Sequence, residues 1–142
     1  MKTKCLALGI LLFFTVATLH AQQPPQDPLG ENLFPPELLM QNQKAIGLTD
    51  DQKSFAKSEI QKAQSKFTDL QWQLQNEVET MAALVKQDRA DEQQVLAQLE
   101  KVLNLEREIK RTQIALIIRL KNKLTSEQQA QLREIKSKLQ TK

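Results

Sequence analysis

Apolar residues recur at helical spacing along most of the chain, and the longest such run starts at Asp50. Steps of three and four residues connect its members, and no Gly or Pro interrupts them, which is typical of one face of an α-helix. At about 1.5 Å per residue, the predicted helix is more than about 50 Å long. The apolar positions of this run are Ala56, Ile60, Ala63, Phe67, Leu70, Leu74, Val78, Met81 and Val85.

A second long stripe follows the short polar connection from Lys86 to Ala90, and Asp91 is a suitable N-cap for its helix. Glu106 and Gln113 interrupt this stripe. Because so short a connection favours an antiparallel neighbour, the two helices are predicted to pack as a hairpin with a shallow crossing angle. The apolar residues of the stripe are Val95, Leu99, Val102, Ile109, Leu116 and Leu120, widened by Leu96, Leu103 and Ile117.

Shorter amphipathic segments flank this hairpin. Pro36 suits the first turn of a helix that is predicted to stop at Gly47, and a last helix is predicted to open at Thr125. No segment has the alternation of a strand. The predicted fold is therefore all-α, with four helices: a long antiparallel hairpin and short N- and C-terminal helices. The apolar residues of the short helices are Leu38, Leu39, Ala45 and Ile46 in the first and Leu132, Ile135 and Leu139 in the last.

One motif occurs twice, 76 residues apart (124 minus 48), each time at the predicted start of a helix. In each copy a Thr hydroxyl can accept from the backbone N–H three residues on, and the Gln at that position can accept from the Thr N–H. Two capping boxes are therefore predicted. Gly47 precedes the first copy and suits a left-handed helix end. The copies are Leu48-Thr49-Asp50-Asp51-Gln52 and Leu124-Thr125-Ser126-Glu127-Gln128.

The first 21 residues are built like an export signal. Lys2 and Lys4 precede an apolar run that ends at Leu19, and Ala21 is a small residue at a suitable cleavage point. The apolar run of roughly 15 residues is shorter than the roughly 20 that a membrane span needs. We therefore expect a signal peptide over 1–21 that is cleaved near Ala21.

Cleavage would remove the only cysteine, Cys5, and the only histidine, His20. The exported protein would then have no disulfide and no imidazole, so packing must stabilise it. Residues 22–33 are predicted to form a flexible Pro/Gln-rich linker, and 34–142 a single helical domain.

Charge is unevenly distributed along the predicted mature chain. Without Lys2 and Lys4, 18 basic residues stand against 17 acidic ones, a net charge of +1. Residues 22–106 carry 8 basic and 14 acidic side chains (net −6), and 107–142 carry 10 and 3 (net +7). This distribution fits either a solvated helical surface or a field that steers partners or pairs two protomers. Nucleic acid is not an expected partner, because the basic half lacks interleaved exposed aromatic residues.

Five residues stand out as candidates for a client or dimer surface. Trp72 lies about 200° around its helix from Leu70 and from Leu74, away from the predicted hairpin core. It either contacts a partner or is covered by the first helix or a second protomer. Off the apolar stripe of the third helix lie Ile114 and Ile118, whose face Arg107 and Arg111 continue. That face is predicted to be covered by a short helix or a second protomer, or to bind clients.

The chain resembles the Spy/CpxP family and its heavy-metal-sensor and metal-resistance relatives. The resemblance covers about Phe34 to Lys138 and rests on the two Leu-Thr-x-x-Gln motifs at the start of the second and fourth helices. The segments FPPELLMQNQKAIGLT and LEREIKR are similar to the metal-sensor branch. The resemblance implies a periplasmic helical hairpin that dimerises into a curved cradle. Members act as ATP-independent chaperones, inhibitors of envelope-stress sensor kinases, or metal-responsive sensors.

Metal binding has few candidate ligands in the predicted mature chain. Relatives that bind nickel, cobalt or zinc do so largely through His, which this chain lacks after cleavage. Met40, Met81 and Glu106 are the weak candidates. The methionines are expected to pack in the core, and Glu106 to pair with Lys110 at i+4.

Three hypotheses follow. The first is a non-enzymatic envelope-stress chaperone without a cofactor, a homodimer that binds unfolded or misfolded clients, with a membrane sensor kinase or sigma-factor regulator as a further possible partner. The second is a periplasmic heavy-metal sensor or resistance protein that binds a divalent or soft cation. The third is a structural coiled-coil module. Enzymatic activity is not expected, because the chain has no Gly-rich phosphate loop and no recognisable nucleophile and base pair.

Overall fold

The computed structural model describes residues 30–140, which are helical apart from short connections. The predicted signal peptide and residues 22–29 of the predicted linker lie outside the described residues. Near the end of the predicted linker, Gly30–Asn32 form a short 3-10 helix. The elements are η1 (Gly30–Asn32), α1 (Pro36–Gln41), α2 (Asp50–Val85), α3 (Glu92–Asn122) and α4 (Ser126–Gln140).

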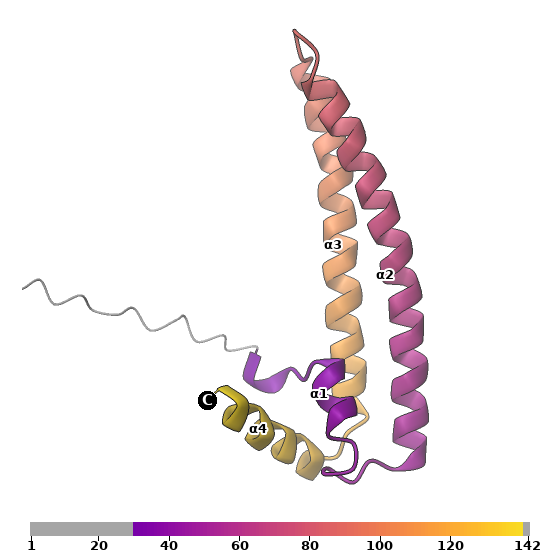
Figure 1. The fold of residues 1–142 in the computed structure, drawn as a ribbon, viewed down its shortest axis with the longest axis vertical. Helices are drawn as coiled ribbons and strands as arrows, with labels where there is room; N and C mark the ends of the chain where they lie inside the picture. Colours follow the sequence, from indigo (N-terminus) through magenta and orange to yellow (C-terminus); the bar gives the residue numbers. More distant parts are fainter. Residues whose placement is uncertain (1–29, 141–142) are drawn as a thin grey trace, which may run out of the picture.

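The two long helices form the predicted antiparallel hairpin (Figure 1). α2 has 36 residues and α3 has 31, so they are about 54 and 46 Å long. The predicted caps are confirmed at both starts: Thr49 accepts from the Gln52 N–H, and the Asp91 carboxylate accepts from the Gln94 N–H at 3.0 Å. The all-α, four-helix fold that the sequence predicts is thus the fold of the described residues.

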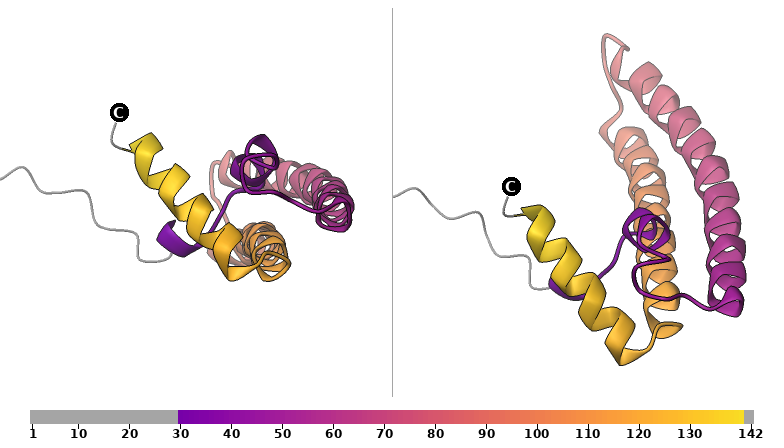
Figure 2. Two further views of the ribbon diagram at one scale, coloured as in Figure 1. Left: turned by 90° about the horizontal axis from the view of Figure 1, so that it is seen from below. Right: turned by 60° about the horizontal axis from the view of Figure 1, so that its bottom comes forward.

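The buried core lies at the base of the hairpin, where the chain enters α2 and leaves α3. There α1 lies across the two long helices, and α4 leaves the end of α3 at an angle (Figure 2). Side chains from all four helices meet at this point. The core residues are Phe34, Leu38, Leu39, Ile46, Leu48, Ala56, Leu116, Leu120, Leu124 and Leu132.

Farther from the base, the hairpin consists of two helices alone. Beyond buried Leu70, the half-buried positions of α2 are Leu74, Glu77, Met81 and Leu84. Val78 and Val85, which the sequence placed on the apolar stripe, are 38% and 58% exposed and lie beside this seam. The physical reason is that one helix covers only part of its neighbour's apolar face when no third element packs over the seam.

The seam of α3 contains the six predicted residues Val95, Leu99, Val102, Ile109, Leu116 and Leu120, and two further ones that were not predicted. Glu106 and Gln113 are exposed, whereas Leu105 and Thr112 are half-buried at the positions next to them. Leu105 and Thr112 continue the three-and-four spacing from Val102, so the helix has no interruption in its packed face. The predicted interruption of the stripe was wrong.

The first helix is shorter than predicted. α1 ends at Gln41, not Gly47, because the Asn42 side chain donates to the Leu38 carbonyl at 2.8 Å and turns follow. Gly47 has a φ of 61°, the left-handed conformation that the sequence predicted for it. Ala45, which was expected on the apolar side of this helix, is exposed, while Ile46 is buried.

The last helix packs by its first half. Leu132 is fully buried, Ile135 is half-buried, and Leu139 is 63% exposed. Lys136 donates to the carbonyl oxygens of Gly30 and Leu33, which joins the two ends of the described chain. No helix of the described residues is long and apolar enough to cross a membrane.

Candidate functional site

The two Leu-Thr-x-x-Gln motifs meet at the base of the hairpin. Both capping boxes are present: each Gln side-chain oxygen accepts from its Thr N–H at 3.0 Å, and each Thr hydroxyl accepts from its Gln N–H at 3.2 Å. The two glutamines also bond each other. Gln52 Nε2 donates to Gln128 Oε1 at 2.9 Å, and Gln128 Nε2 donates to Gln52 Oε1 at 3.0 Å.

This amide pair also closes the neighbouring turns. Gln52 Nε2 donates to the carbonyl of Lys123 at 2.8 Å, and Gln128 Nε2 donates to the carbonyl of Gly47 at 3.3 Å. Both side chains are buried, and every polar atom of the pair has a partner. The motif residues therefore join the starts of α2 and α4, and Leu48 and Leu124 are in the core beside them.

An exposed face of α3 combines the predicted apolar and basic residues. Ile114 is 46% exposed and Ile118 is 38% exposed, so neither α1 nor α4 covers them. With Arg107 and Arg111 they line one shallow depression, together with Lys110, Ala115 and Arg119. We call these seven residues the α3 face. The sequence left open whether a short helix of the same chain covers this face. In the structure, none of the described helices does.

Trp72 lies on the outer side of α2, as predicted from its position around the helix. It is 68% exposed, and the first helix does not cover it. Nearby, Gln75 donates to Glu79 at 2.7 Å along the same polar surface. Trp72 is not among the residues that line the depression on the α3 face. The described chain thus presents two separate exposed surfaces, one aromatic and polar, the other apolar and basic.

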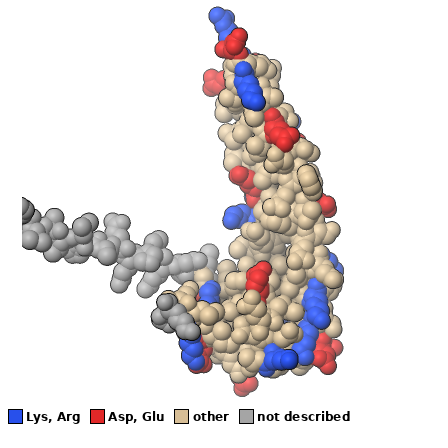
Figure 3. Space-filling model, viewed as in Figure 1, with Lys and Arg blue, Asp and Glu red and all other residues tan. Residues whose placement is uncertain are grey.

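A buried carboxylate joins the two long helices near the base. Glu59 of α2 accepts from Arg119 of α3 at 3.0 Å and from Lys62 at 2.9 Å. The hydrogen bond from Lys62, followed by the one from Arg119, lowers the pKa of Glu59 below its usual value. On this side of the hairpin, charged side chains therefore bridge the seam. On the face drawn in Figure 3, Lys and Arg lie beside Asp and Glu along the lower edge, and both signs are also scattered over the upper half.

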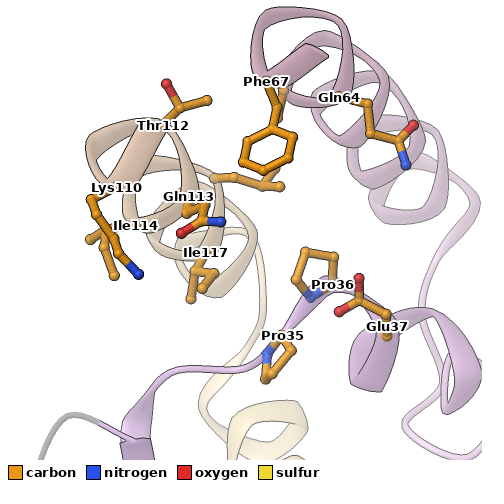
Figure 4. Close-up of a pocket in the computed structure, with 12 residues that line it drawn as sticks. Pro35, Pro36, Glu37, Gln64, Phe67, Lys110, Thr112, Gln113, Ile114 and Ile117 are labelled. Atoms are coloured by element: carbon orange, nitrogen blue, oxygen red, sulfur yellow. The ribbon is translucent and has the colours of Figure 1, made fainter. Parts of the chain in front are cut away.

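A cleft of about 400 Å³ lies between the start of α1 and the hairpin. Figure 4 shows Pro35 and Pro36 across this space from Phe67 of α2 and Ile117 of α3. Its lining is mainly apolar. The cleft lacks the convergent charged groups that would assign a chemistry to it, and it adjoins the α3 face through Ile114.

The three weak metal-ligand candidates lie apart. Met40 packs against the core at the base, Met81 is half-buried near the far end of α2, and Glu106 is exposed between them along the hairpin. The ion pair predicted between Glu106 and Lys110 is absent, because two long exposed side chains gain little from pairing in water. Within residues 30–140, no group of three or more His, Cys, Asp and Glu side chains is placed to hold a metal ion.

Sequence reasoning did not single out the contact between the two motifs or the basic residues of α2. Lys62 and Lys66, one helical turn apart, lie opposite Arg111 and Arg119 on α3. Their i, i+4 spacing was visible in the sequence, but the register of the hairpin that brings them to the arginines was not. Comparison of the chain with protein-family models, with curated proteins and with solved structures finds no match.

Proposed function

We propose that this protein is a non-enzymatic, exported chaperone of the envelope, similar to the Spy/CpxP family, and that it holds unfolded or partly folded proteins without ATP. The observation that carries the proposal is the α3 face. Two large apolar side chains, Ile114 and Ile118, are exposed there beside four basic ones. A soluble helix that exposes such a face without a covering element is typical of a binding surface.

The mechanism needs no cofactor. The cations attract acidic segments of unfolded chains over about 8–10 Å at physiological salt, and the isoleucines then bind apolar side chains at short range. A shallow depression buries little of each client segment, so the affinity is low and the client can leave and finish folding. The hydrogen bonds between the starts of α2 and α4, together with the long hairpin, hold this face in a fixed shape.

The proposal includes a homodimer. Apolar residues along the upper seam remain exposed in the single chain, among them Val78, Val85, Leu96 and Leu103. A second protomer would remove such residues from water, and two copies would present two α3 faces to one client, which raises the effective affinity. A sensor kinase or sigma-factor regulator as a partner is a further expectation of the family resemblance.

The test is suppression of client aggregation in buffer that contains chelator and no nucleotide. Wild-type protein is expected to keep a reduced model client in solution. The paired variant Ile114→Ser and Ile118→Ser is expected to lose most of this effect, because the apolar part of the face is gone. The control is Leu139→Ser, which removes an exposed apolar side chain from the end of α4, outside the α3 face and outside the residues assigned to the dimer contact. Equal loss in both variants would contradict a site at the α3 face.

For metal sensing, the alternative from the resemblance, residues 30–140 provide no group of candidate ligands. Its candidate ligands are separated along the whole hairpin. A saturable rise of the melting temperature with zinc, nickel, cobalt or copper would nevertheless establish it, because a ligand that binds only the folded state stabilises that state.

A further inference from the structure

Four cationic side chains surround a groove between α2 and α3, on the side of the hairpin that Glu59 and Glu108 bridge. Lys62 and Lys66 contribute from α2, and two arginines, one on each side of Ala115, contribute from α3. The groove has a volume of about 260 Å³. Its lining residues are Lys62, Ala63, Lys66, Glu108, Arg111, Thr112, Ala115 and Arg119. We call this the basic groove.

Two carboxylates hold these four cations in place. Glu59 bonds Lys62 and Arg119, and Glu108 pairs with Arg111 at 3.5 Å and with Lys66 at 3.7 Å. Each carboxylate thus takes one lysine from α2 and one arginine from α3. Four positive charges against two negative ones leave an excess of two, and the side chains of all four cations are more than half exposed.

Stability alone does not account for this arrangement. Ion pairs whose cations lie largely in water contribute little to stability, and two carboxylates would need only two partners. The additional cations repel one another unless an anion lies between them. A multiply charged anion in the basic groove would satisfy the excess charge that the protein itself leaves unmatched.

The bottom of the basic groove suits the close approach of such an anion. Ala63 and Ala115 are small, so the longer cationic side chains can converge above them. Thr112 also lines the groove, and its hydroxyl is the one buried side-chain polar atom among the described residues without a hydrogen-bond partner. In Figure 4, Thr112 points away from Pro35 and Ile117, toward the opposite side of α3.

We infer that the basic groove binds a phosphate-bearing anion with several negative charges, such as a condensed phosphate or a phosphorylated head group. Phosphate oxygens accept well from Arg and Lys, and the arginines provide paired donors. This site shares Arg111, Ala115 and Arg119 with the α3 face, but its remaining residues lie toward α2 and it needs neither isoleucine of that face.

Calorimetric titration of the mature protein with tripolyphosphate tests the inference, with sodium sulfate at equal ionic strength as the reference for screening. Saturable binding of one tripolyphosphate per chain is expected. The paired variant Lys66→Gln and Arg111→Gln is expected to weaken it at least about tenfold, since two charge-assisted contacts are lost. The control Lys57→Gln and Lys101→Gln removes the same charge from exposed positions outside the groove, and is expected to change the affinity less than about twofold.

Two further arms separate the sources and the functions. Co-sedimentation with phosphatidylcholine vesicles that contain phosphatidic acid, with the same variant dependence, would identify a head group as the ligand; tripolyphosphate binding alone would identify a soluble anion. Ile114→Ser with Ile118→Ser should leave anion binding unchanged even if it abolishes client binding. No binding in either arm, or equal loss in the Lys57/Lys101 control, would overturn the inference.

Discussion

Gln52 and Gln128 each have two roles, one within their own helix and one between helices. Within the helix each completes a capping box, and between helices the two amides bond each other and a carbonyl of the facing turn. The local role could be predicted from the sequence, because Thr and Gln three residues apart define it. The contact between them could not, since it depends on how α4 returns to the start of α2.

Replacement of Gln128 by Ala is expected to lower the free energy of unfolding by about 1–3 kcal/mol, because buried polar atoms of Gln52 and the Thr125 N–H lose their partner. Gln61→Ala, at an exposed position of α2, is the control and should have little effect. Urea unfolding of both single variants and of Gln52→Ala with Gln128→Ala gives the coupling energy. Simple additivity would show that the amide pair does not form.

Glu59 gives the base of the hairpin a pH dependence. Its pKa is lowered in the folded protein, so its pairing stabilises the fold fully above the usual carboxyl pKa of about 4.3 and ceases to do so as the pH falls through the lowered value. The stability difference between wild type and Glu59→Gln, from urea unfolding between pH 7 and pH 3, should therefore shrink toward the acid end. A stability difference that stays constant with pH would show that the ionised carboxylate does not stabilise the fold.

At the scale of the elements, α1 and α4 decide where the molecule has a core. Both cover only the base, so Ala56 on the packed face of α2 is buried there, whereas Met81 and Leu84 on the packed face near the far end are only half-buried. The sequence predicted the helices and most of their bounds because periodicity and caps are local signals. It did not predict which part of each stripe is covered, since that depends on where the short helices pack. The end of α1 was missed because the chain leaves the helix at Asn42, whose backbone and side-chain N–H groups both donate to the Leu38 carbonyl, and continues in turns.

Two leucines of α4, one buried and one exposed, test whether this helix packs on the base. Leu132→Ala is expected to destabilise the protein by about 2–5 kcal/mol, because it removes a fully buried side chain from the core. Leu139→Ala, on the exposed end of the same helix, should stay within about 0.5 kcal/mol. Thermal and urea unfolding check both. A similar small effect for the two variants would show that α4 is not docked on the base in solution.

At the scale of the whole molecule, the core and the bonded motifs lie at the base, and the candidate binding surfaces lie along the hairpin. Trp72 reports on one of them, because the sequence has a single Trp. The predicted position of Trp72 away from the core is confirmed by its exposure, and so is the common face of Arg107, Arg111, Ile114 and Ile118. Their use by a client or a second protomer could not be read from the sequence, because it is a property of the partner as much as of the chain.

Iodide quenching of Trp72 is a direct check of its surface. In dilute protein, iodide should quench the fluorescence nearly as well as it quenches a free indole, since the ring is mostly in water. Strong protection at all concentrations would show that another chain covers this surface permanently. Protection that appears only at high concentration would place Trp72 in a reversible contact between copies.

Holding of clients should also weaken with salt. In the proposed mechanism the basic residues of the α3 face attract acidic segments of clients, and screening shortens the range of such an attraction from about 10 Å at 0.1 M to about 3 Å at 1 M ionic strength. Aggregation suppression measured across this range should therefore decline, and more steeply for acidic clients than for basic ones. Aggregation suppression that does not change with salt would show that the apolar side chains alone bind the client.

The most direct test of the account is to locate the client on the surface. A photo-reactive benzophenone side chain at position 118, on the α3 face, should cross-link to a permanently unfolded model protein. The same group at position 83, an exposed site near the far end of α2, should cross-link much less. Strong cross-linking at 118 and weak cross-linking at 83 is the predicted result. Equal yields, or a higher yield at 83, would contradict the assignment of client binding to the α3 face.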